Sequence, residues 1–291
     1  MNWHLLFHSE SGALRAPWRI FLFCLASSAA FITLEAFAAP FIGKTLNATG
    51  LGDQATDLWV SVFALLAGTA ISLRLIDKRN WRDVWLDRAA ARPSLFGFGF
   101  IIGALAIGLP IVLLIGVHWL RDTPGTAGSW PAAAARATFF LLPAALLEEL
   151  MTRGYILSAL RQALGWKWAI ALTSVAFGLL HLRNTGANAE SVTLVTLAGF
   201  FLAAVLYATR SLYAAWMAHF AWNWTMAVLF HSAVSGFPVE SPGYRYVDAG
   251  PDWATGGVWG PEGGAPAGLG MAGGIVYLLA RRSRARRDQE K

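Results

Sequence analysis

The chain has 291 residues, of which 56% are hydrophobic and 14% are charged, and its mean hydropathy is +0.49. A soluble domain carries about 25% charged residues, so the composition excludes a water-soluble globular fold and a disordered chain. The single cysteine, Cys24, excludes a disulfide-rich secreted protein. The net charge of +6 does not indicate a nucleic-acid partner, because the basic residues lie between apolar runs, as they do in loops facing anionic lipid. We therefore expect an all-α fold, a polytopic helical bundle in a lipid bilayer.

Eight apolar runs are candidate transmembrane helices, since roughly 20 helical residues are needed to cross the hydrocarbon core. They cover residues 18–41, 57–75, 95–120, 134–157, 167–185, 190–209, 212–232 and 264–280. The charged stretch 76–93 is predicted to be an interfacial helix or loop. The segment 233–266, rich in Gly and Pro, is expected to be a flexible external loop.

The distribution of Lys and Arg predicts the orientation, because basic residues are concentrated in cytoplasmic loops. With eight spans, 17 of these residues fall on one side and five on the other, while Arg153 lies within a span. We expect both termini to be cytoplasmic, in a bacterial inner (plasma) membrane. A signal peptide ending at Ala38 is an alternative interpretation of the first run, but a polar stretch containing Glu10 precedes it.

The fourth run carries ionisable side chains, which are costly in a bilayer and therefore mark candidate functional positions. Its sequence LLEELMTRGYIL places Glu148, Glu149 and Arg153 in the pattern E-E-x-x-x-R. Glu149 and Arg153 are four residues apart on a helix, so they can form an intrahelical ion pair. Glu148 points about 100° away and lacks that cation. Its carboxylate is suited to act as a general acid or base.

Two further runs carry polar side chains at helical spacing. In the fifth run, Phe177 and His181 lie four residues apart on one helical face, and in the seventh run His219 and Asn223 lie one turn apart. The depth of these residues in their spans is compatible with a single site that includes Glu148. A structural network of hydrogen bonds between helices is the alternative, since polar residues also hold transmembrane helices together.

The motifs E-E-x-x-x-R, F-x-x-x-H and H-x-x-x-N, in this order on successive hydrophobic helices, resemble those of the CPBP family. These are the CAAX-protease and bacteriocin-processing (Abi) intramembrane endopeptidases. The resemblance is strong over residues 134–232. It implies a helical endopeptidase whose water-filled cavity opens to the bilayer and whose substrate is a membrane-associated peptide or protein.

By this similarity, Glu148 and His181 hold and activate the hydrolytic water, while His219 and Asn223 stabilise the oxyanion. The supporting residues are Glu149 and Arg153, which brace the helix, and Phe177, which packs beside the site. Thr152 occupies a position that is often aromatic in relatives, which bears on substrate fit. Three regions follow from the layout: residues 1–133 with three helices and the segment 76–93, the catalytic core 134–232, and residues 233–291 with the external loop, the last helix and a basic cytoplasmic tail.

Peptide hydrolysis needs an activated water and a stabilised oxyanion, and these residue types supply both without a cofactor. Zinc held by Glu148, His181 and His219 is the alternative, since a carboxylate, two imidazoles and water form a common zinc site. We expect no metal, because the chain lacks the H-E-x-x-H helix and the zinc arrangement leaves no separate base. A non-catalytic scaffold or bacteriocin-immunity protein is a second functional class. A proton-coupled transporter is a third, but the inverted repeats that it would need are not evident.

Overall fold

A computed structural model describes residue 7, residue 12, residues 14–48 and residues 52–289. Its long helices are α2 (Ala16–Phe37), α3 (Ala39–Ala48), α4 (Gly52–Ile71), α5 (Pro93–Gly116), α6 (Trp130–Arg153), α7 (Tyr155–Leu180), α8 (Ala189–Thr209), α9 (Leu212–Trp224) and α11 (Ala265–Gln289). The short elements are η1 (Ser72–Ile76), η2 (Trp81–Val84), β1 (Leu120–Pro124), η3 (Thr225–Leu229), β2 (Tyr244–Asp248), α10 (Asp252–Thr255), η4 (Gly257–Trp259) and η5 (Pro261–Gly263). Each of the eight predicted apolar runs overlaps a long helix.

The prediction of an all-α membrane bundle is confirmed. Five helical stretches among the described residues are long and apolar enough to cross a membrane. They are Ala16–Phe37, Ala55–Ile76, Pro93–Gly116, Trp130–Leu180 and Ala189–Thr209. The stretch Trp130–Leu180 comprises both α6 and α7. Outside these five, α9 has 13 residues before it continues as the π-helical turn η3, and α11 ends in a basic run. A total of eight spans remains a prediction.

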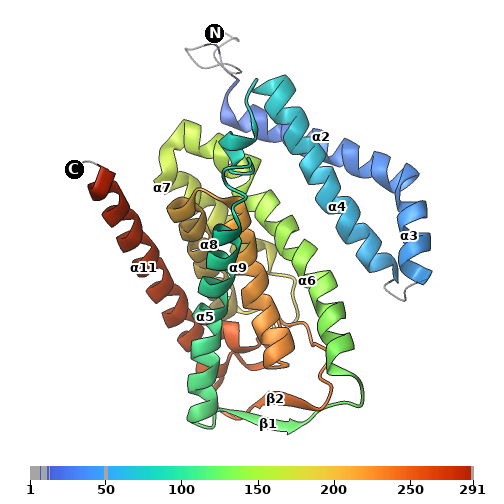
Figure 1. Ribbon diagram of the computed structural model, residues 1–291, viewed down its shortest axis with the longest axis vertical. Coiled ribbons are helices and arrows are strands. Elements are labelled where there is room, and N and C mark those ends of the chain that lie inside the picture. The colour runs from blue at the N-terminus through green and yellow to red at the C-terminus, as the bar shows by residue number, and fades with distance from the viewer. Residues whose placement is uncertain (1–6, 8–11, 13, 49–51, 290–291) are drawn as a thin grey trace.

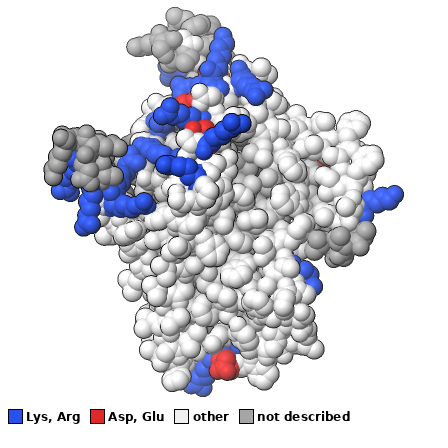
Figure 2. Space-filling view, in the orientation of Figure 1, with Lys and Arg blue, Asp and Glu red and all other residues white. Residues whose placement is uncertain are grey.

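The helices form a bundle with a side arm (Figure 1). Helix α9 packs against α5, α6 and α8, and α11 packs against α5 and α8 on the other side. Helices α2, α3 and α4 form the side arm, which contacts the bundle through α6 and α7. The start of α2 and the end of α11 lie at one end of the molecule, and the two-stranded antiparallel sheet of β1 and β2 lies at the other. Figure 2 shows Lys and Arg gathered at the end where α2 begins and α11 ends.

Two glycines allow very close packing of α9 on α5. Gly99 and Gly103 are spaced as G-x-x-x-G, a motif that lets two membrane helices approach closely. A Cβ atom added at Gly99 would lie 2.2 Å from the carbonyl oxygen of Ala214, and one at Gly103 would lie 2.0 Å from that of Ala218. These contacts fix the position of α9 in the turns that precede and include His219.

The junction of α6 and α7 differs from the predicted boundaries. The apolar runs end at residue 157 and resume at residue 167, which suggests a loop between them, whereas α6 meets α7 directly at Gly154. Gly165 then interrupts α7 with φ 77° and ψ 173°, a conformation that glycine adopts without a steric penalty. The chain therefore reverses direction through two glycine breaks and a short helical piece.

The expectation of a flexible loop over residues 233–266 is wrong, because this segment folds into β2, α10, η4 and η5. Positive φ angles at Gly256 and Gly260 provide its turns, and α11 already begins at Ala265. Arg136 of α6 donates two hydrogen bonds to Glu240, at 2.9 and 2.5 Å, and holds the pKa of that carboxyl group below its usual value. Periodicity could not reveal this fold because the segment is held by turns and tertiary contacts.

Candidate active site

The E-E-x-x-x-R motif of α6 contains a buried ion pair. Arg153 Nη1 lies 3.1 Å from Glu149 Oε1, and both side chains are fully buried. Arg153 also donates a hydrogen bond to the carbonyl oxygen of Gly199 in α8 at 3.0 Å, and its guanidinium group lies 4.2 Å from the centre of the Phe177 ring. The i, i+4 pair that the spacing predicts is thus present, and its arginine ties α6 to both α7 and α8.

Glu149 also contacts a residue of the third motif. Its Oε1 atom lies 3.0 Å from Nδ1 of His219, which is buried in α9. An ionised carboxylate can only accept hydrogen bonds, so Nδ1 of His219 carries the proton. The other ring nitrogen, Nε2, then faces Glu148 Oε2 at 3.8 Å. Glu149 therefore orients the His219 ring, a contact that the linear motif does not indicate.

His181 approaches Glu148 from the end of α7. As the C-terminal cap of that helix, it places Nδ1 2.8 Å from the carbonyl oxygen of Phe177, so Nδ1 is again the protonated nitrogen. Its Nε2 atom lies 3.8 Å from Glu148 Oε2. The ring of Phe177 packs against both His181 and His219, with centroids 4.9 and 5.8 Å apart. The two histidines therefore present Nε2 to the same carboxylate oxygen.

The spacing around Glu148 suits a bridging water. A distance of 3.8 Å is too long for a direct hydrogen bond but allows one water molecule to contact both groups. Glu148 Oε2 is buried and has no hydrogen-bond partner among the described residues, although the side chain as a whole is 34% exposed. The side chain is accordingly accessible, while the oxygen that faces the histidines is shielded.

A small cavity adjoins the two histidines. It is lined by His181, His219 and Asn223 together with apolar side chains from α7, α8 and α9, and it offers about 30 Å³ of space to water. One water needs roughly 10–15 Å³ of such space, so the cavity has room for one or two. Asn223 lies one turn beyond His219 on α9, as the H-x-x-x-N spacing predicts, and both residues line the cavity.

Glu262 is a buried acidic residue at this cavity that the sequence motifs do not include. Its Oε2 atom accepts a hydrogen bond from Trp222 Nε1 at 2.8 Å, and Oε1 accepts bonds from the backbone and hydroxyl groups of Ser235 at 2.6 and 2.7 Å. These bonds fasten the segment 233–266 to α9 directly beside Asn223. The sequence feature that could have indicated Glu262 is its position as an acidic residue within the glycine-rich sequence TGGVWGPEGG.

Thr152 takes part in the bracing of α6 through its hydroxyl group. Its hydroxyl donates to the carbonyl oxygen of Glu148 at 2.6 Å and accepts a hydrogen bond from Arg153 Nη1 at 2.7 Å. The hydroxyl thus gives the arginine a partner besides Glu149.

The described residues contain no group of three or more His, Cys, Asp or Glu side chains in an arrangement that could hold a metal ion. The donor types at the site do suit zinc, since His181 and His219 each present Nε2 and Glu148 presents a carboxylate oxygen. If zinc bound here, these three residues would be its protein ligands and the metal would lower the pKa of a bound water.

Residues 130–225 match the family model described as Rce1-like, type II CAAX prenyl endopeptidase Rce1-like. The match covers α6 to α9, the helices that carry Glu148, His181 and His219. No curated protein and no solved structure matches the chain. The resemblance that the three motifs carry is therefore confirmed over residues 130–225, which are similar to the Rce1-like family model.

Proposed function

We propose that this protein is an intramembrane endopeptidase that hydrolyses a peptide bond in a membrane-associated peptide or protein. The observation that carries the proposal is the approach of two imidazole Nε2 atoms, from His181 and His219, to one carboxylate oxygen of Glu148, each at 3.8 Å. The similarity of residues 130–225 to a prenyl endopeptidase family supports the same reaction class. The integral membrane character of the chain is consistent with a substrate that reaches the site within or at the bilayer.

In the proposed reaction, Glu148 and His181 bind a water molecule and Glu148 accepts its proton. The water oxygen forms a bond to the carbonyl carbon of the peptide, which gives a tetrahedral intermediate with a negative oxygen. Collapse of the intermediate breaks the C–N bond, and the proton held by Glu148 passes to the leaving amine. The products are a carboxylic acid and an amine, and the glutamate returns to its ionised form. General base catalysis of this kind contributes about 10²–10⁴-fold to the rate.

The developing oxyanion needs hydrogen-bond donors, and we assign this role to His219 and Asn223. Asn223 supplies an amide N–H. His219 donates from Nε2 in the form of its imidazole that carries a proton on both ring nitrogens, while Nδ1 contacts Glu149. Both residues line the same cavity beside His181. Removal of one donor from an oxyanion hole costs about 10²–10³-fold in turnover.

A comparison of new peptide termini in cell membranes tests the proposal. Membranes from cells that produce the wild-type chain are compared with membranes that contain Glu148→Gln at equal abundance. Glu190→Gln serves as the matched control, because Glu190 is an exposed carboxylate in the first turn of α8. New termini that are present with the wild type and with Glu190→Gln, but absent with Glu148→Gln, identify substrates. Identical termini in all three samples contradict a peptidase and favour a scaffold or immunity protein.

A further inference from the structure

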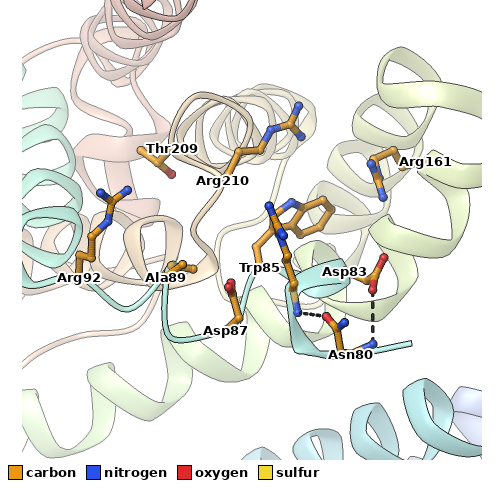
Figure 3. A pocket seen from close by; sticks show the side chains of 11 residues that line it. Asn80, Asp83, Trp85, Asp87, Ala89, Arg92, Arg161, Thr209 and Arg210 are labelled. Carbon is orange, nitrogen blue, oxygen red and sulfur yellow. Dashed lines mark hydrogen bonds between the residues drawn. The ribbon is translucent and has the colours of Figure 1, made fainter. Parts of the chain in front are cut away.

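A second cavity, separate from the candidate active site, lies at the end of the bundle where Lys and Arg gather. It has a volume of about 480 Å³ and is bordered by the loop that follows η2, the first helical piece of α7 and the end of α8. Four arginines line it: Arg82, Arg92, Arg161 and Arg210. Figure 3 shows Arg92, Arg161 and Arg210 arriving from three different segments around the pocket, with Trp85 between them.

The positive charge in this cavity is only partly balanced by carboxylates of the described residues. Two carboxylates, Asp83 and Asp87, also line it, but Asp83 already pairs with Arg79 at 3.3 Å. Among the described ion pairs, none involves any of the four lining arginines. The cavity therefore combines four guanidinium groups with two carboxylates, one of which is occupied elsewhere.

Aromatic rings, rather than carboxylates, hold the two inner arginines. The guanidinium groups of Arg161 and Arg210 lie 5.2 and 4.2 Å from the centre of the same Trp166 ring. Arg161 Nε is buried without a hydrogen-bond partner. Burial lowers the pKa of Arg210 to about 10, and the nearby charges of Arg282 and Arg161 act in the same direction. A bound anion would relieve both the repulsion and the lost hydration.

The position of the cavity indicates which anion it meets. Arg92 precedes α5 and Arg210 follows α8, so the guanidinium groups lie where helices leave the hydrocarbon core. Exposed Trp168, beside Lys167, lies at the same end of α7, as expected of an aromatic side chain at headgroup level. Arginine binds phosphate oxygens in a bidentate manner, and basic pockets between membrane helices on the cytoplasmic side bind anionic headgroups. We propose that this arginine pocket binds the phosphate group of an anionic phospholipid.

Thermal unfolding of the purified full-length chain in detergent micelles tests the proposal. Phosphatidylglycerol added to the micelles should raise the midpoint by about 3 °C or more relative to an equal mole fraction of phosphatidylcholine. Arg161→Gln with Arg210→Gln should remove most of this rise. The matched control is Arg88→Gln with Arg284→Gln, which removes two exposed basic residues from the same end and should retain the rise. Arg82→Gln with Arg92→Gln, both at exposed positions, provides a second pocket variant if the first does not fold.

The outcomes separate the pocket from diffuse attraction and lipid from free phosphate. If the pocket variants and the control lose the rise in midpoint equally, the rise comes from surface charge and the proposal is overturned. If inorganic phosphate alone reproduces the full rise and removes the response to phosphatidylglycerol, the ligand of the pocket is a soluble phosphate and not a lipid. No rise with phosphatidylglycerol in the wild type would also refute the pocket.

Discussion

Two adjacent glutamates have different surroundings, and that difference defines two kinds of residue at the site. Glu149 is fully buried and bonded to both Arg153 and His219, whereas Glu148 is partly exposed and faces two imidazoles without a direct hydrogen bond at Oε2. A buried charge that loses its partner is strongly destabilising. Loss of a carboxylate that has no such partner leaves no charge unpaired.

We therefore predict that Glu149→Gln lowers the thermal unfolding midpoint in detergent by about 10 °C, which corresponds to a loss of about 3–5 kcal/mol. Glu148→Gln should shift the midpoint by no more than a few degrees while it abolishes hydrolysis. Arg153→Met combined with Glu149→Gln should cost less than the sum of the two single changes, because the pair is removed together. Comparable destabilisation by the two glutamate variants would contradict this assignment.

The chemistry at the histidines yields a prediction about metal. If Glu148 and His181 activate water directly, purified active enzyme should contain far less than one zinc ion per chain and should keep its activity after exhaustive chelation. Elemental analysis alongside the activity assay measures both. Stoichiometric zinc that is lost in His181→Ala, with activity restored by added zinc after chelation, would replace this mechanism with a zinc hydrolase.

At the scale of elements, the packing of α5 on α9 determines where two site residues lie. Gly103→Ala places a methyl group against the Ala218 carbonyl, next to His219, so α9 must move. We predict that this variant loses at least tenfold in activity and unfolds at a lower temperature. Gly108→Ala on the same helix is the control, since its added Cβ would lie 3.6 Å from Thr225 in ordinary contact. An equal effect of the two variants would argue against close packing as the cause.

The sequence predicted the helices and the site to different extents, for physical reasons. Apolar runs predict the helices, and i, i+4 spacing predicts the pair of Glu149 with Arg153, because both depend on local helical geometry. The contact of Glu149 with His219 joins residues 70 positions apart in the chain, and spacing along one helix carries no information about it. The sequence does not predict the position of Glu262 for a related reason. Its segment is folded by glycine turns and tertiary hydrogen bonds and has no periodic pattern of hydrophobic residues.

At the scale of the whole molecule, the basic residues give an orientation that can be measured. The end where α2 begins and α11 ends carries most of the Lys and Arg seen in Figure 2. We predict that this end is cytoplasmic, because basic residues are retained there during insertion. A phosphatase fusion after Lys291 should be inactive, and one inserted near Gly243, in the segment 233–266, should be active. The reverse pattern would refute the orientation and place the arginine pocket on the outer side.

The direct junction of α6 and α7 at Gly154 has a consequence for biosynthesis. Glu148 and His181 lie on the two legs of one helical hairpin, so they enter the bilayer together as the chain emerges from the ribosome. His219 and Asn223 arrive later with α9, and Glu262 follows after α9. The nascent chain thus holds Glu148 and His181 before it holds the other polar residues of the candidate site. On the proposed mechanism the oxyanion donors reach the site only with α9, so a chain that ends after α8 should not hydrolyse peptide bonds.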